Sequence, residues 1–229
     1  MIMDVDKQIS YLKNFITEKR FDRFLEVLQE RTRYITLVLE DVFQGHNASA
    51  VLRSCDCFGI QDVHFIENRN EFKTNEEVSM GAAQWLNIYR YREKEKEKEK
   101  EKNNTETCYR LLKERGYTIV ATSPHYQSVS IRELKIDKPL AIVFGAEKEG
   151  LSEYALKNAD EYVYIPMYGF TESFNISVSA ALCMYELVNK LRSSDVNYHL
   201  SEKEKNEILL QWLKTSIKDA DKILERMRG

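Results

Sequence analysis

A single stretch, IPMYGFTESFNISVSAA at residues 165–181, joins a predicted strand to a predicted helix. The strand ends at Pro166, because proline lacks the N–H group that a sheet ladder requires. A polar loop follows, and a helix rich in small residues begins near Asn175, so this helix can approach a neighbouring backbone closely. Tight packing of the helix on a sheet, with Ser173 or Asn175 serving only as its cap, explains the same pattern.

Apolar segments rich in β-branched and aromatic residues alternate with helical patterns through the middle of the chain. The predicted strands cover residues 34–39, 62–66, 87–91, 117–121, 140–144 and 161–165. The predicted helices cover residues 47–58, 76–86, 105–115, 152–158 and 176–191. Gly59 and Gly116 directly follow helical patterns, where a left-handed C-terminal cap belongs. This alternation predicts an α/β fold with a parallel sheet and helices on both faces.

Amphipathic helices are predicted at both ends of the chain. Residues 5–33 predict a helix that is broken near Thr17, and residues 201–228 predict a helix that starts at a capping box. The C-terminal apolar stripe has to be buried, either against the N-terminal helices or against a second subunit. The predicted domains are an N-terminal helical extension at 1–33, an α/β domain at 34–192 and a C-terminal helical extension at 193–229.

The composition, 43% hydrophobic and 31% charged among 229 residues, is typical of a soluble globular protein. A net charge of −3 excludes a wholly basic coat, so any nucleic-acid contact must come from local patches. The four cysteines have no repeated spacing, and Asp4 and Asp6 stand where a secretory leader would be apolar, which predicts a cytoplasmic protein with reduced thiols. No apolar run is long enough for a membrane span. The Glu/Lys alternation at 92–102 predicts a solvated helix extension or loop.

A second stretch, HNASAVLRSCDCFG at residues 46–59, directly follows a predicted strand. Asn47 is a good helix N-cap, and Ser49 and Arg53 fall on the side of the helix opposite its apolar stripe. On spacing alone, Arg53 is a surface arginine of an amphipathic helix. Cys55 reads as a core residue, and Cys55-x-Cys57 has no second ligand pair, so no metal site is predicted.

A third stretch, IVFGAEKEGLS at residues 142–152, runs from a strand through a glycine turn into a helix capped by Ser152. Backbone N–H groups at such a turn are well placed to meet a ligand. Leu151 stands where a P-loop needs its lysine, which excludes nucleoside triphosphate binding of that kind. Glu147 is either a helix-capping acid or a positioned functional carboxylate, and the local pattern does not decide between them.

Taken in this order, the three stretches resemble the three motifs of the SpoU/TrmH family of SPOUT-class RNA 2′-O-methyltransferases. The resemblance covers roughly residues 37–187, and the pattern I-P-M-x-G-x-x-x-S-x-N-I-S-V-x-x-A is present in full at 165–181. It implies a SPOUT fold whose C-terminal part is tied in a deep trefoil knot, an exception to the rule against threading. It also implies S-adenosylmethionine bound in that knot and a homodimer with its active sites at the interface.

The resemblance carries residue roles onto matching positions of this chain. The implied catalytic set is Asn47, Arg53, Glu147, Ser173 and Asn175. The implied cofactor-binding residues are Thr122, Gly145, Ile165, Met167 and Phe174. Arg53 is either the activator of the ribose hydroxyl or, because arginine holds its proton strongly, a phosphate clamp.

The resemblance also bears on the substrate. The terminal helices and the absence of a separate N-terminal RNA-binding domain favour tRNA, with the D-loop guanosine-18 as the expected target. The residues at 43–46, FQGH, depart from the basic residues that similar proteins carry there, which puts the particular RNA in question. The alternatives are 2′-O-methylation of ribosomal RNA or of another tRNA position, a non-catalytic knotted RNA-binding dimer, and a small-molecule methyltransferase.

Overall fold

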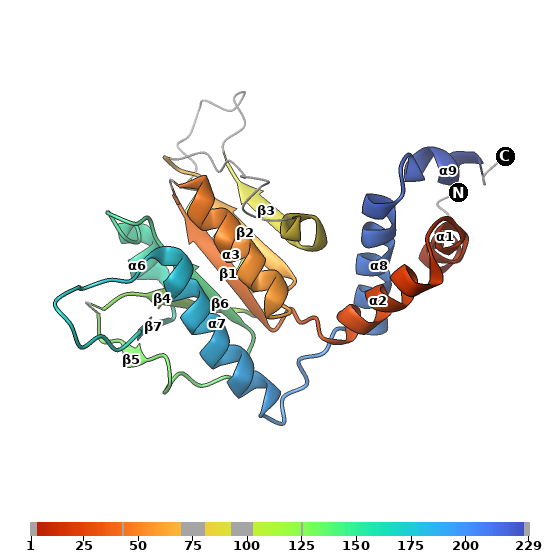
Figure 1. Cartoon of the computed structure of the whole chain (residues 1–229). Helices are drawn as coiled ribbons and strands as arrows, with labels where there is room; N and C mark the ends of the chain where they lie inside the picture. Colours follow the sequence, from red (N-terminus) through yellow and green to blue (C-terminus); the bar gives the residue numbers. More distant parts are fainter. Residues whose placement is uncertain (1–3, 43, 70–80, 93–102, 125, 227–229) are drawn as a thin grey trace. The chain divides into compact units, whose positions relative to one another are not determined.

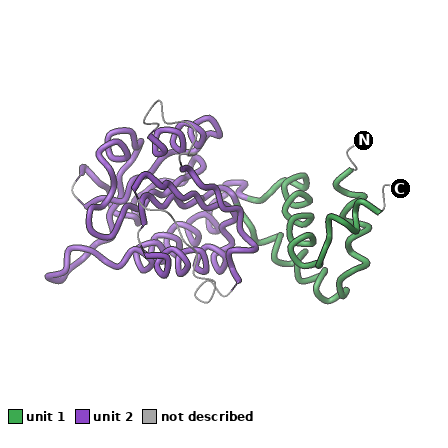
Figure 2. The backbone as a smooth tube through the Cα atoms, turned by 90° about the horizontal axis from the view of Figure 1, so that it is seen from above, with its two compact units in different colours: residues 1–32, 199–229 green, residues 33–198 purple. Residues whose placement is uncertain are grey.

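The computed structural model describes residues 4–42, 44–69, 81–92, 103–124 and 126–226. These residues belong to two units, coloured separately in Figure 2. The larger unit is Arg33–Tyr198, and the smaller one combines both ends of the chain, Met1–Thr32 and His199–Gly229.

The larger unit is built on a parallel sheet. Within the described residues the sheet has seven strands in the order β3-β2-β1-β6-β4-β7-β5. The strands are β1 Ile35–Glu40, β2 Asp62–Ile66, β3 Asn87–Tyr91, β4 Thr118–Thr122, β5 Val129–Ser130, β6 Leu140–Phe144 and β7 Glu161–Tyr164. Every neighbouring pair runs parallel. The predicted parallel α/β sheet is therefore confirmed.

Helices cover both faces of this sheet. Within the described residues, the helices of the unit are α3 Gly45–Cys57, η2 Ala82–Trp85, α5 Asn104–Glu114, α6 Glu153–Asn158 and α7 Ile176–Arg192. Figure 1 shows α3 and α7 beside each other across one face. Leu37 and Leu39 of β1 are buried with these two helices, whereas Val38 is buried with α5 and α6. Alternate residues of one strand thus contribute to two cores, because successive side chains point to opposite faces.

Several local predictions are confirmed. Gly59 and Gly116 have positive φ angles, 76° and 84°, directly after helices. Thr17 caps a new helix, and Ser201 and Glu204 form the predicted capping box. Cys55 is fully buried in the core.

Other predictions were wrong. Ser49 is completely buried and does not lie on an exposed face. The C-terminal helix is interrupted, because Ile217 is extended and Asp219 has a φ of 57°. The short edge strand β5 was not predicted. Of the predicted helix at 76–86, the described part forms a 3-10 turn over Ala82–Trp85. Residues 76–80, like the Glu/Lys run at 93–102, lie outside the described residues.

The smaller unit is helical, and the apolar stripes of its amphipathic helices are buried against one another. It consists of α1 Val5–Leu12, η1 Lys13–Phe15, α2 Glu18–Gln29, α8 Glu202–Ser216 and α9 Ala220–Arg226. Trp212 of α8 is almost fully buried, and its ring meets Phe24 of α2 edge to face at a centroid distance of 5.7 Å. The stripe of the C-terminal helix therefore packs against the N-terminal helices, the first of the two options left open by the sequence.

His64 of β2 makes the stability of the larger unit sensitive to pH. Its ring is buried, stacks on Tyr89 at 4.6 Å and places Nδ1 2.9 Å from the Tyr91 hydroxyl. Burial, helped by the nearby positive charge of Arg115, lowers the pKa of His64 to about 3. The folded protein therefore holds a neutral imidazole where the unfolded chain would bind a proton.

We expect the free energy of unfolding to fall as the pH drops from about 6.5 towards 4. The unfolded state binds one more proton than the folded state in this window, so His64 contributes up to about 1.4 kcal/mol per pH unit. Urea unfolding followed by circular dichroism at several pH values measures this slope. His64→Gln should flatten it, while the exposed His46→Gln should not. An unchanged slope in His64→Gln would contradict the assignment.

Candidate functional site

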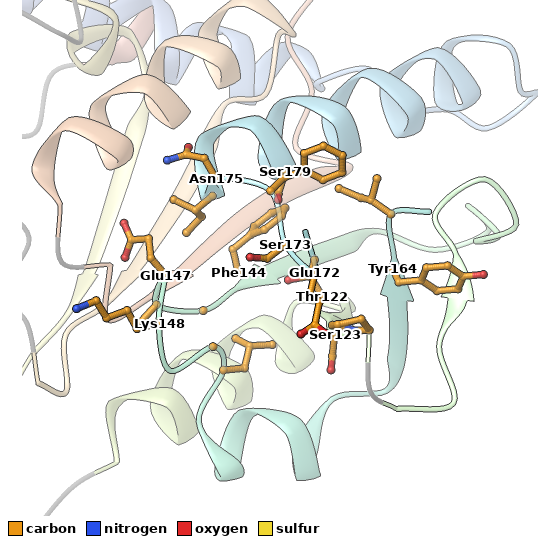
Figure 3. Close-up of a pocket in the computed structure, with 18 of the residues that line it drawn as sticks. Thr122, Ser123, Phe144, Glu147, Lys148, Tyr164, Glu172, Ser173, Asn175 and Ser179 are labelled. Atoms are coloured by element: carbon orange, nitrogen blue, oxygen red, sulfur yellow. The ribbon is translucent and has the colours of Figure 1, made fainter. Parts of the chain in front are cut away.

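Three loops at the carboxyl ends of the strands surround one cavity (Figure 3). The first leaves β4 at residues 122–124, the second follows β6 at 145–151, and the third joins β7 to α7 at 165–175. The cavity has a volume of about 680 Å³, which is in the range of pockets that hold small molecules. Ligands of open α/β sheets bind at this end of the strands, so the fold and the cavity indicate the same site.

The structure brings most of the predicted site residues to this cavity. Nine of the ten line it: Asn47, Thr122, Gly145, Glu147, Ile165, Met167, Ser173, Phe174 and Asn175. These residues come from four separate parts of the chain.

Arg53 is the exception. It lies on α3 beyond the cavity-lining turn, with an exposed side chain, and it does not line the cavity. Within the part of the chain that the structure describes, Arg53 forms no hydrogen bond or ion pair through its side chain. Within one chain, four members of the predicted catalytic set therefore line the cavity, and the fifth, Arg53, does not.

Asn47 is the centre of a hydrogen-bond network between the loops. Its Nδ2 donates to Glu147 Oε1 at 2.8 Å and to Gln44 Oε1 at 3.1 Å. Its Oδ1 accepts from Asn175 Nδ2 at 3.1 Å. The predicted N-cap role of Asn47 is wrong, because α3 begins at Gly45 and Asn47 is buried within its first turn. The amide is used instead to join three segments.

Asn175 is the cap of α7, one of the roles that its sequence left open. Its Oδ1 accepts from the backbone N–H of Ser177 at 2.9 Å, so it caps α7. Its Nδ2 remains available for Asn47. Glu147 accepts a hydrogen bond from the Asn47 side chain, so it acts as a carboxylate positioned by a side chain and not as a helix-capping acid. Figure 3 shows Glu147 and Asn175 near each other at one side of the pocket.

The second loop closes on itself at two glycines. Ala146 and Gly150 exchange two backbone hydrogen bonds, at 3.1 and 2.9 Å. A Cβ atom added to Gly145 would lie 2.2 Å from the carbonyl carbon of Gly150, and Gly150 itself has a φ of 69°. Only a residue without a side chain permits this approach at position 145.

Two further side chains define the chemistry of the cavity wall. Thr122 donates its hydroxyl hydrogen to the Val143 carbonyl at 2.8 Å, which fixes the end of β4 against β6. Burial raises the pKa of the Cys183 thiol to about 12. Cys183 therefore remains a neutral thiol at neutral pH and is not activated as a nucleophile.

The sequence reasoning missed several polar residues of the cavity. These are Gln44, Ser123, Lys148, Glu149, Glu172 and Ser179. Gln44 belongs to the FQGH segment, whose sequence stands out only for its lack of basic residues. The others follow or flank predicted site residues, so proximity in sequence was the one signal that could have found them.

Comparison with known proteins places the chain in a family. Residues 34–185 match the model of the SpoU rRNA Methylase family. A tRNA (guanosine(18)-2′-O)-methyltransferase of Borreliella burgdorferi is 43% identical over 94% of this chain and 94% of its own length. Its Thermus thermophilus counterpart is 38% identical over 74% of this chain and 82% of its own length.

The solved structures agree. The crystal structure of the TrmH/SpoU tRNA modifying enzyme of Aquifex aeolicus superposes with a TM-score of 0.74 at 31% identity, covering 87% of this chain and 97% of that one. The fold is that of the SpoU-type methyltransferases. This chain belongs to the SpoU rRNA Methylase family.

No helix in the described ranges is both long and apolar enough to cross a membrane. Among those same residues, no group of three or more His, Cys, Asp or Glu side chains is arranged to hold a metal ion.

Replacing Gly145 by alanine should weaken ligand binding at the cavity while the sheet stays folded. The added Cβ would force the 145–151 loop open, so the affinity for S-adenosylmethionine should fall by roughly tenfold or more. Isothermal titration calorimetry measures the Kd. Gly169→Ala is the matched control, because a Cβ at Gly169 meets nothing within 4 Å. Equal affinities in the two variants would contradict the proposed constraint.

Proposed function

We propose that this chain is a tRNA (guanosine(18)-2′-O)-methyltransferase that uses S-adenosylmethionine as its methyl donor. Relatives with this name are 29–43% identical over most of the chain. The observation that carries the proposal is the convergence of nine site residues, separated by up to 128 positions, on one cavity. A tRNA substrate also makes the cytoplasm the expected location.

The cavity wall fits S-adenosylmethionine. Ile165, Met167 and Phe174 offer apolar surface to an adenine ring or a methionine chain, and Gly145 of the second loop lines the same cavity. A structure of the SpoU methyltransferase AviRb of Streptomyces viridochromogenes contains AdoMet, and it shares the fold with this chain at 19% identity and a TM-score of 0.58. When bound, S-adenosylmethionine supplies an electrophilic methyl group.

The C-terminal part of the sheet is, in this proposal, the trefoil knot of the family. The support is topological. Strand β6 lies between β1 and β4, and β7 pairs with the other edge of β4. The loops after β6 and β7 then meet again at one cavity. The domain organisation into 1–33, 34–192 and 193–229 also stays a proposal.

The side chains of the site have separable tasks in this reaction. A ribose hydroxyl is a weak nucleophile, so it must be oriented in line with the methyl group and must lose its proton. Asn47, Glu147 and Asn175 hold the loops in one arrangement through their hydrogen bonds. Ser173 lies beside Asn175 at the rim, where its exposed hydroxyl can bind the incoming nucleotide.

Arg53 is better suited to clamp a phosphate than to act as a base. An exposed guanidinium retains its proton at any physiological pH. Its paired N–H groups match the geometry of a phosphate and stabilise a developing negative charge. Since Arg53 lies outside the cavity of its own chain, the proposal places it at a site completed by a second subunit.

A homodimer is supported by the outer face of α7. Val178, Leu182 and Tyr185 are 44%, 41% and 61% exposed. Their spacing of four and three residues puts them on one side of the helix, while its other side is buried in the core. A contiguous exposed apolar stripe of this kind marks an interface, and a symmetric pair would cover both copies at once.

Methyl transfer from labelled S-adenosylmethionine should modify unmodified bulk tRNA but not ribosomal RNA. Mass spectrometry of the digested tRNA should locate 2′-O-methylguanosine at position 18. Arg53→Ala should reduce the rate by at least about a hundredfold, because a transition-state contact is lost. Label only in ribosomal RNA would keep the chemistry and overturn the substrate. RNA binding without any transfer would instead support a non-catalytic dimer.

Charge on the outer face of α7 should dissociate the dimer. In Val178→Glu/Leu182→Glu, two apolar contacts are replaced by carboxylates that a partner could not solvate, so sedimentation velocity should show a monomer. Both side chains are exposed in the single chain, and the melting temperature of the monomer should change little. Arg110→Glu, on the exposed side of α5, is the control and should sediment as wild type. A wild-type protein that sediments as a monomer would refute the homodimer.

A further inference from the structure

Glu40 is a buried carboxylate at the end of β1, and it does not line the cavity. Its side chain is 1% exposed. Oε1 accepts hydrogen bonds from Thr105 Oγ1 at 2.5 Å and from Ser152 Oγ at 2.8 Å, and Oε2 accepts from the Ser152 backbone N–H at 2.8 Å. Both carboxylate oxygens are therefore used.

The surroundings suit a carboxylate more than any other group. Within the described part of the chain, Glu40 forms no ion pair, yet all its partners donate. Thr105 lies in the first turn of α5, and Ser152 is the N-cap of α6. The positive ends of two helices thus face the same carboxylate, which offsets part of the cost of burying it.

Through Ser152, Glu40 connects the end of β1 to the 145–151 loop that lines the cavity. The 145–151 loop leaves β6 at Phe144, which is in register with Leu39 of β1. It ends at Ser152, which Glu40 holds by two hydrogen bonds. Adjacent residues of one strand, Leu39 and Glu40, therefore fix both ends of the loop.

We infer that Glu40 is a positioning residue that holds the 145–151 loop, with Gly145 and Glu147, in its cofactor-binding conformation. Glu40 does not line the cavity, so it acts through Ser152 and not by contact with a ligand. The inference rests on the proposed function, because it assumes that this loop binds S-adenosylmethionine. If the loop is released, only a fraction of the molecules is competent to bind, and the apparent affinity falls by that fraction.

Thr105→Val provides the matched control for Glu40→Gln. Both substitutions remove a hydrogen bond from the same buried cluster, but the bond to Thr105 leads to α5 and not to the loop. In Glu40→Gln, an N–H₂ group replaces one of the two acceptor oxygens, so Ser152 keeps at most one of its two acceptors and the attachment of the loop is weakened. Ser152→Ala removes one of the two loop bonds from the other side, and Ser152→Thr restores a hydroxyl.

The experiment measures the Kd of S-adenosylhomocysteine by calorimetry, the KM and kcat for S-adenosylmethionine on tRNA, and the melting temperature, all on the full chain. We expect both Glu40→Gln and Thr105→Val to lower the melting temperature. Only Glu40→Gln should raise Kd and KM, by roughly tenfold, with kcat within about twofold of wild type. Ser152→Ala should raise Kd by a smaller factor, and Ser152→Thr should restore it.

Two results would overturn the inference while leaving the proposed function intact. One is a Kd in Glu40→Gln equal to that of wild type despite a lower melting temperature. The other is a Kd raised equally by Thr105→Val, which would indicate a general loss of stability. A wild-type chain that binds no S-adenosylhomocysteine would overturn the proposed function itself, and the inference with it.

Discussion

The amide of Asn47 is the contact on which the arrangement of the site depends. It joins the start of α3, the loop after β6 and the cap of α7 through Glu147 and Asn175. A side-chain amide is suited to this position because it donates and accepts at once. Because Asn47 is buried, its hydrogen bonds contribute to stability: a polar group that is left unpaired away from water costs about 1–3 kcal/mol.

The sheet is what brings these segments within reach of one another. Parallel strands all end at one edge, so loops that are distant in sequence emerge side by side. Strand β1 lies near the centre of the sheet, and its alternate residues are buried in the cores on the two faces. Its last two residues, Leu39 and Glu40, contact the two ends of the 145–151 loop. Rigid strands and a glycine turn that admits no side chain leave the loop after β6 few conformations. Such preorganisation is what an RNA methyltransferase needs to align a weak nucleophile.

Local chemistry that depends on a few neighbouring residues was predicted well from the sequence. Positive φ angles at Gly59 and Gly116, the helix break near Thr17 and the cap at Ser152 follow from the residues themselves. Predictions that needed long-range information did worse. Asn47 is an acceptable cap by type, but a partner 100 residues away, Glu147, uses its amide instead. The interruption of the C-terminal helix at 217–219 carries no proline or glycine to announce it.

By itself, the sequence determined the parallel α/β class, the positions of six strands and the residues that match the family's motifs, because periodicity and turn chemistry are local properties. Tertiary structure alone decided which of those residues share a cavity and that Arg53 does not. It also decided that Ser49 is buried, that Gln44 belongs to the network and that Glu40 attaches the cavity loop. Hydrogen bonds between strand ends depend on strand order, and a one-dimensional pattern does not contain that order.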